Sequence, residues 1–303
     1  MHTTPMQENF GVILHADAAE TVADVTRDRV AGLLKDHGTV LFSGFRASRD
    51  DFDDFTDRVT GDYMNYRGGG YVRKAVAKGE LLSTRYDHGR KEQMTFGLPL
   101  HGEMYYTDAR PAVLWFYCAK PADEDGQTTA CDGAEIFRRL PQKWKDLLLE
   151  KRLMFLRVYR DGEWQKIYQT EDVAEACDFA AGNGITVEFD AAERTMRTKY
   201  LVHAALPTRW GGHTAYINNL LTVFMQMEMG RGDTSTVWLE DGSPIPKDLM
   251  DEVRAIQDEL TLDLDWAPGD FAIVDNSRAL HGRRAFKDVD REVYLRMVRD
   301  VDF

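Results

Sequence analysis

Two residue types that commonly bind metals lie close together at His101-Gly102-Glu103. In an extended segment, residues i and i+2 point to the same side, so this imidazole and this carboxylate face one spot. A second histidine would complete the two-histidine, one-carboxylate face that holds a non-haem iron(II) and leaves positions open for a co-substrate and dioxygen. His281 is the best candidate, because it follows the apolar run Phe271–Val274 within the segment Asp275–Arg283.

Other interpretations of these residues remain open at this point. A His-x-Glu spacing is common by chance, and a single histidine is more often a surface or core residue than a ligand. The zinc-protease helix signature His-Glu-x-x-His is absent. Two imidazoles and a glutamate also suit a catalytic zinc, as in a zinc-dependent hydrolase. A non-catalytic binding protein on the same scaffold is a further alternative, because a fold does not fix a function.

The composition narrows the range of partners. The 303 residues carry a formal net charge of −13 at pH 7, which repels phosphate backbones and argues against nucleic acid. No apolar run approaches the roughly 18 residues of a membrane span. The N-terminus lacks the basic start and apolar stretch of a signal peptide. The three cysteines lack paired spacing, so we expect no disulfide framework and a cytoplasmic location.

The N-terminal part, from about residue 20 to about residue 60, has the pattern of a helix, a strand and a second helix. Gly38 is placed to end the first helix, and Val40–Phe42 is a short apolar strand. Ser48 followed by Asp51 resembles a capping box that would begin the second helix. These signals are local, so they predict the elements but not the way they pack.

Continuous apolar runs later in the chain predict buried strands at Ala112–Tyr117, Phe271–Val274 and Val293–Val298. Many short strands and few helices favour a mainly β fold with peripheral helices (α+β), either a sandwich or a barrel. No linker divides the chain, so we expect one domain over residues 1–303. Mixed helical and turn signals suggest an insertion between core strands at about residues 143–210.

Several motifs follow one another in the order found in a known family. The segments Leu98–Tyr106, Phe116–Cys118 and Asp125–Thr129 resemble the taurine dioxygenase (TauD/TfdA) superfamily of iron(II)- and 2-oxoglutarate-dependent oxygenases. Gly38–Phe45 is similar to the family's N-terminal opening, and Asp275–Arg283 is similar to its distal-histidine segment. The resemblance therefore runs almost from end to end.

This resemblance implies a double-stranded β-helix, which is a jelly-roll-like core, and a set of cofactors: iron(II), 2-oxoglutarate as co-substrate, and O2. It implies that His101, Glu103 and His281 are the iron ligands. Glu103 stands where many members have aspartate, which resembles the clavaminate synthase-like and amino-acid hydroxylase branch. The threonine of the family's Gly-Gly-Glu-Thr motif corresponds to Thr128, and would donate a hydrogen bond to the far carboxylate of 2-oxoglutarate. Here the motif reads Asp125-Gly126-Gln127-Thr128.

The family also implies an arginine that pairs with the same carboxylate, since a guanidinium makes a bidentate contact. The sequence departs from the family pattern, because Glu292 stands where the first arginine could be expected. Either a bulge brings Arg291 inward or Arg296 takes the role. We favour Arg296, which lies between two apolar residues in the middle of a strand. The alternative for Arg296 is a surface arginine paired with an acid.

The implied activity is oxidation of an unactivated C–H bond of a small amino-acid-like molecule, with release of succinate and CO2. Hydroxylation, desaturation and cyclisation all remain open, as do the substrate and the oligomeric state. Related halogenases leave the carboxylate position vacant for chloride. Glu103 would fill that position here, so halogenation is disfavoured. Candidate substrate contacts are Tyr105, Asn218, the loop Leu81–Phe96 and the arginine that does not bind 2-oxoglutarate. Asn218 could equally be a turn residue.

Overall fold

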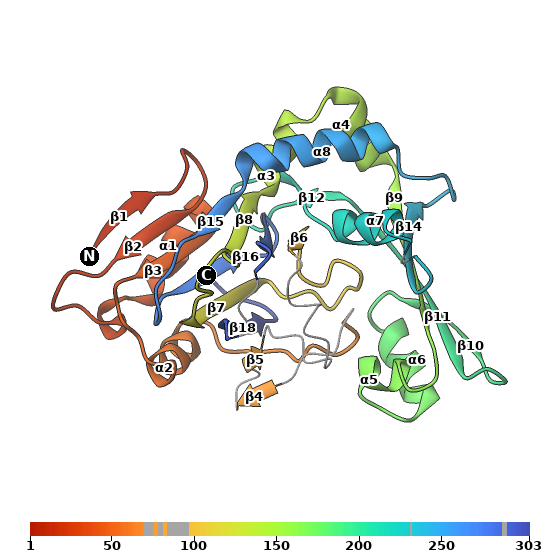
Figure 1. The fold of residues 1–303 in the computed structure, drawn as a ribbon, viewed down its shortest axis with the longest axis horizontal. Coiled ribbons are helices and arrows are strands. Elements are labelled where there is room, and N and C mark those ends of the chain that lie inside the picture. Colours follow the sequence, from red (N-terminus) through yellow and green to blue (C-terminus); the bar gives the residue numbers. More distant parts are fainter. Residues whose placement is uncertain (70–74, 78–80, 84–96, 231, 287–289) are drawn as a thin grey trace.

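The largest sheet has eight strands in the order β1-β2-β3-β16-β7-β18-β5-β4, all antiparallel except the pair β2 and β3 (Figure 1). The computed structural model describes residues 1–69, 75–77, 81–83, 97–230, 232–286 and 290–303. The strands of this sheet are β1 His2–Pro5, β2 Val12–His15, β3 Thr39–Ser43, β4 Ala75–Ala77, β5 Leu81–Ser83, β7 Val113–Lys120, β16 Phe271–Asp275 and β18 Glu292–Val298.

A second, four-stranded sheet has the order β15-β8-β17-β6. Its strands are β6 Leu98–His101, β8 Thr128–Asp132, β15 Leu262–Leu264 and β17 Ala279–Arg283. Apolar residues of both sheets, such as Phe116 of β7 and Leu280 of β17, belong to one buried core. The protein is therefore a mixed, sheet-rich structure with helices around it, as the sequence predicts at this level.

The other face of the large sheet packs against two N-terminal helices, α1 (Arg27–His37) and α2 (Arg49–Val59). Phe52 and Phe55 of α2 contact Trp115 of β7 and Phe271 of β16, with ring centroids between 5.4 and 6.4 Å apart. Strands β7 and β16 are thus buried on both faces. This explains why their sequences are continuous apolar runs rather than alternating ones.

The predicted helix–strand–helix opening is confirmed. Helix α1 ends at Gly38, which adopts a left-handed conformation (φ 69°) that is easy only for glycine. Helix α2 begins after Ser48, and Asp51 completes the capping box. Both signals depend on a few consecutive residues, so the sequence alone was enough to locate them.

A third sheet lies to one side of the core, at the right of Figure 1, in the order β10-β11-β9-β14. It falls largely within the expected insertion but takes β14 from later in the chain. Its strands, the adjoining hairpin and the local helices are β9 Arg152–Tyr159, β10 Thr186–Asp190, β11 Thr195–His203, β14 Ser235–Leu239, β12 Ala205–Pro207, β13 Thr214–Tyr216, α5 Trp164–Tyr168 and α6 Val173–Ala181.

The remaining helices are η1 Val22–Asp24, α3 Gly133–Arg139, α4 Gln142–Glu150, α7 Leu220–Glu228 and α8 Lys247–Leu260. Helix α8 buries Leu249, Val253 and Leu260 on one face, as their spacing predicts. Within the described part of the chain, no helix combines the length and apolarity that crossing a bilayer requires.

Strand β18 presents its residues alternately to the two sides of the large sheet. Leu295 and Met297 belong to the core between the sheets, whereas Arg296 points to the side covered by α2. The buried Arg296 guanidinium forms ion pairs with Asp53 (3.1 Å) and Asp57 (3.0 Å) of that helix. Arg296 therefore attaches α2 to the sheet.

We predict that Arg296→Leu lowers the free energy of unfolding by about 3 kcal/mol, because it leaves the partly buried Asp53 carboxylate without its cation. Urea denaturation followed by circular dichroism measures this change. The control is Arg299→Gln, which removes an exposed ion pair with Asp62 and should cost less than about 1 kcal/mol. Equal losses in the two variants would contradict a stabilising role for Arg296.

Candidate functional site

The two histidines of interest lie side by side on neighbouring strands. His101 ends β6 and His281 is in the middle of β17, and the two are directly opposite each other in the antiparallel register. Their ring centroids are 4.4 Å apart. Glu103 follows two residues after His101, and the potential ligand atoms of all three residues lie within 4.8 Å of one another. All three side chains are buried.

Hydrogen bonding fixes the orientation of the first imidazole. His101 Nδ1 lies 2.9 Å from the carbonyl oxygen of Pro99. A carbonyl can only accept, so Nδ1 carries the proton and the lone pair of Nε2 is available to a metal. His281 Nε2 lies 3.5 Å from Glu103 Oε2, so these two donor atoms face the same point. A carbonyl behind a histidine is a common way to orient a metal ligand.

Asn276 holds the backbone of Glu103 in place. Its Oδ1 accepts from the Glu103 amide (2.8 Å), and its Nδ2 donates to the carbonyls of Glu103 (3.1 Å) and Pro111 (2.8 Å). Asn276 is completely buried. Met104, directly after Glu103, has a positive φ of 61°. Sequence reasoning did not single out Asn276, although its place between a buried strand and His281 was a possible signal.

Gly102 separates the first two potential ligands and must be small. A Cβ atom there would lie 2.4 Å from the Tyr105 ring, which is far inside van der Waals contact. The Gly102 amide donates to the Asn218 carbonyl (2.9 Å), which ties the strand end to the turn before α7. The close packing of Tyr105 under Gly102 therefore helps to set the distance between His101 and Glu103.

The structure also brings Tyr105 and Asn218, the two expected substrate contacts, to this region. The Tyr105 hydroxyl donates to the Asn276 carbonyl (2.8 Å). The Asn218 side chain donates to the Ala204 carbonyl (2.9 Å) and accepts from the Leu220 amide (2.8 Å). The polar groups of both side chains are therefore already bonded to the protein. Most of the expected substrate loop, residues 84–96, lies outside the described residues.

Of the two candidate arginines, the structure brings Arg291 and not Arg296 to Thr128. Arg291 Nη2 donates to Thr128 Oγ1 (3.0 Å), and its Nε donates to the Gly126 carbonyl (2.8 Å). The register between β18 and β7 shifts between Glu292 and Val293, which is the irregularity that the sequence left as an alternative. The preference for Arg296 is corrected in this respect, because its guanidinium faces α2 on the other side of the sheet.

Arg291 is a buried cation without a counter-ion among the described residues. It is 5% exposed, and it forms no ion pair with any carboxylate in the described part of the chain. Burial and the nearby Arg283 guanidinium lower the pKa of Arg291 to about 10. Arg283 lies opposite Thr128 in the sheet and was not identified from the sequence. Its position two residues after His281, on the same side of β17, was the available signal.

The donor set suits a ferrous ion. Two imidazole nitrogens and one carboxylate oxygen, all on one side, match the three-ligand face of non-haem iron(II) and leave coordination positions for other ligands. The neighbouring Arg291 provides uncompensated positive charge, which would favour an anionic co-substrate. Together these features define the class of an iron-dependent oxygenase that uses a carboxylate co-substrate.

Comparison with known proteins agrees with this class. The family described as "Taurine catabolism dioxygenase TauD, TfdA family" matches residues 2–298, and the chain belongs to this family. It is an iron(II)- and 2-oxoglutarate-dependent dioxygenase, and its cofactors are Fe(II), 2-oxoglutarate and O2. The resemblance noted in the sequence is thereby confirmed, and the zinc hydrolase and non-catalytic alternatives are set aside.

Two relatives align over most of the chain. A clavaminate synthase-like protein of Arabidopsis thaliana is 26% identical over 270 residues, which cover 84% of this chain and 79% of the relative. The dapdiamide synthesis protein DdaC of Enterobacter agglomerans is 25% identical over 285 residues, which cover 89% of this chain and 84% of the relative. Both identities are low, so they do not identify a substrate.

Solved structures share the fold. PvcB of Pseudomonas aeruginosa superposes with a TM-score of 0.60 at 16% identity, covering 98% of this chain and 91% of PvcB. A taurine dioxygenase of Burkholderia xenovorans gives a TM-score of 0.61 at 12% identity, covering 98% of this chain and 88% of that protein.

We predict that Asn276→Ala weakens metal binding by about 10- to 100-fold, because Glu103 loses the amide that fixes its backbone. Anaerobic titration with Fe(II), followed by calorimetry, measures the affinity. His101→Ala should abolish binding in the same assay, since it removes a ligand.

The matched control is Asn9→Ala, which changes an exposed asparagine far from Glu103 in sequence and should bind Fe(II) like the wild type. An Asn276→Ala protein that folds and binds Fe(II) with unchanged affinity would show that Glu103 does not depend on this side chain.

Proposed function

We propose that this dioxygenase oxidises an unactivated C–H bond of a small amino-acid-like molecule in specialised metabolite biosynthesis. The outcome is hydroxylation, or desaturation or cyclisation, with release of succinate and CO2. The observation that carries the proposal is the buried Arg291, which has no counter-ion among the described residues and is hydrogen-bonded to Thr128 of β8, the strand that pairs with the His281 strand β17. A buried cation of this kind is costly unless an anion binds to it.

Each residue of the site has a proposed part. His101, Glu103 and His281 would hold the iron, which when bound supplies the activation of dioxygen that couples decarboxylation of 2-oxoglutarate to C–H oxidation. Arg291 forms the charged contact with the far carboxylate of 2-oxoglutarate, and Thr128 orients the guanidinium and donates to the same carboxylate. The aromatic and aliphatic surroundings exclude water, which strengthens these contacts.

Arg283 adds to this co-substrate site. Its charge lowers the pKa of Arg291, so the two guanidinium groups repel each other. Both pack against the ring of Phe286, at 4.6 Å for Arg283 and 5.6 Å for Arg291. We propose that a dianionic co-substrate relieves this repulsion, which makes its binding favourable in a protein with a net charge of −13.

The relatives support a small-molecule substrate in biosynthesis. DdaC is described as a dapdiamide synthesis protein, and PvcB as an oxygenase from an isonitrile synthetic pathway. Glu103 would fill the ligand position that halogenation leaves to chloride, so we favour C–H oxidation. Tyr105 and Asn218 would shape the substrate space with their apolar parts, because their polar groups are bonded to the protein.

The architecture fits this proposal. We propose that the eight-stranded and four-stranded sheets are the two sheets of a double-stranded β-helix, and that the whole chain is one domain with the third sheet as an insertion. Cys118, Cys131 and Cys177 are unpaired, which supports a reducing compartment such as the cytoplasm. Such a compartment would also keep iron ferrous.

The test is a turnover screen of free amino acids and their derivatives with Fe(II), 2-oxoglutarate and O2. Mass spectrometry detects a gain of one oxygen or a loss of two hydrogens, and a parallel assay measures succinate. Product formation that requires both Fe(II) and 2-oxoglutarate would support the proposal. Purified protein that binds neither Fe(II) nor 2-oxoglutarate would refute it.

We predict that Arg291→Gln raises the Kd of 2-oxoglutarate by about 100-fold, which corresponds to about 3 kcal/mol for the lost charged contact. Anaerobic calorimetry with Fe(II) present gives this Kd. Arg296→Leu should leave the Kd within about twofold, because Arg296 pairs with Asp53 and Asp57. A raised Kd in Arg296→Leu together with an unchanged Kd in Arg291→Gln would show that Arg296 binds the co-substrate.

A further inference from the structure

A second unpaired cation lies on the inserted sheet, outside the centre described above. In β9, alternate residues point to the same face, and Leu153, Phe155 and Tyr159 are all buried there. Arg157 lies on the same face by its position in the strand, and it is partly buried. A charged residue on an otherwise apolar face requires a partner or a function. The alternation along β9 was the sequence signal for Arg157, and sequence reasoning missed it.

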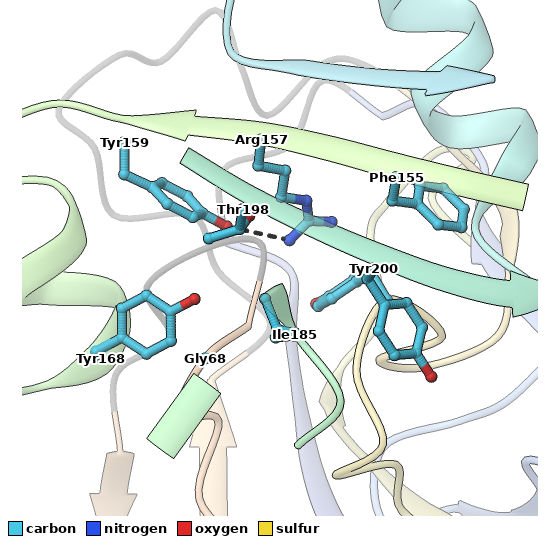
Figure 2. A pocket seen from close by; sticks show the side chains of 9 residues that line it. Gly68, Phe155, Arg157, Tyr159, Tyr168, Ile185, Thr198 and Tyr200 are labelled. Atoms are coloured by element: carbon cyan, nitrogen blue, oxygen red, sulfur yellow. Dashed lines mark hydrogen bonds between the residues drawn. The ribbon is translucent and has the colours of Figure 1, made fainter. Parts of the chain in front are cut away.

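The adjoining strand contributes to the same face. Thr198 of β11 is directly opposite Arg157 in the antiparallel register, and Tyr200 is directly opposite Phe155. Figure 2 shows these side chains around a common pocket, with Tyr168 of α5 approaching from the other side. The pocket therefore lies between the inserted sheet and α5, and its wall is mostly aromatic.

Arg157 has aromatic and hydroxyl neighbours but no counter-ion. Its Nη1 donates to the Tyr159 hydroxyl (3.3 Å), and its guanidinium lies 3.8 Å from the centre of the Tyr106 ring. No carboxylate of the described chain is within ion-pair distance of it. Two other arginines in this part of the chain do have one, Arg152 with Glu240 and Arg194 with Asp161.

Two further hydrogen-bond donors near Arg157 are unused. Tyr168 is only 1% exposed, yet its hydroxyl has no hydrogen-bond partner among the described residues, and Figure 2 shows it pointing into the pocket. Thr198 is 8% exposed, and its hydroxyl is likewise unbonded in the described structure. The Tyr200 hydroxyl differs, because it donates to Asp108 (2.7 Å). One cation, whose printed acceptor is the Tyr159 hydroxyl, and two unbonded hydroxyls thus converge without a carboxylate among the described residues.

We propose that Arg157, Tyr168 and Thr198 bind a carboxylate group of the substrate. This inference rests on the proposed function and specifies its substrate class. A guanidinium and two hydroxyls provide the donors that carboxylate oxygens require. The space beside them is about 10 Å³, roughly that of one water molecule. One ligand oxygen can therefore lie within reach of these donors.

One turn of the chain links the pocket to the metal cluster. Tyr106 lines the pocket and lies under the Arg157 guanidinium, and it is only three residues after Glu103. Arg157 is therefore a specificity residue, and it is separate from Arg291, which faces Thr128.

The experiment measures binding of L-amino acids and their matched primary amides to the full-length protein, with Fe(II) and saturating 2-oxoglutarate under anaerobic conditions. Saturation with 2-oxoglutarate prevents these carboxylates from occupying its own site. Calorimetry should show that at least one free acid binds the wild type about tenfold or more tightly than its amide. Arg157→Gln should abolish this preference, Arg157→Lys should retain part of it, and Tyr168→Phe should weaken the acid severalfold.

The matched control is Arg152→Gln, which removes an exposed arginine of the same strand and should leave the preference unchanged. The inference is overturned if no free acid binds the wild type, or if a folded Arg157→Gln protein keeps the preference for the acid. Should Arg157→Gln fail to fold, Arg157→Lys and Tyr168→Phe decide by the same comparison. The Kd of 2-oxoglutarate is measured first. If the wild type does not bind 2-oxoglutarate, the proposed function is refuted. If the variants bind 2-oxoglutarate with an unchanged Kd, any change in amino-acid binding is due to the substrate contact alone.

Discussion

The candidate site depends on the antiparallel pairing of β6 with β17. This pairing places His101 and His281 opposite each other, and the turn after β6 adds Glu103 to the same point. Backbone hydrogen bonds from Asn276 and the close contact between Gly102 and Tyr105 then fix that turn. A shift of the register by one residue would turn one imidazole to the opposite face and dismantle the cluster.

The large sheet separates two kinds of buried arginine. Arg296 points outward to α2 and is neutralised by two carboxylates, so its ion pairs attach that helix to the sheet. Arg291 points inward, next to Thr128, and has no carboxylate in the described structure. Charge that is compensated within the protein stabilises the fold, whereas charge left uncompensated in a core is available to a ligand.

The lack of a counter-ion among the described residues also distinguishes Arg157 from the many paired arginines at the surface. Arg157 lies on the third sheet, which contributes apolar residues to the main core and forms one wall of a pocket with α5 (Figure 2). The first two sheets would then supply the chemistry, and the third sheet would supply the selectivity.

The sequence by itself determined the elements and the nature of the chemistry. Gly38, the capping box at Ser48 and the apolar run at Phe271–Val274 are local signals, and the spacing of His101 and Glu103 was enough to suggest a metal. The tertiary structure decided which distant residues meet. The preference for Arg291 over Arg296 required the register shift at Glu292. The parts proposed for Asn276 and Arg157 became visible only from their contacts with residues far along the chain. Such contacts depend on strand pairing between remote segments, which local sequence patterns do not specify.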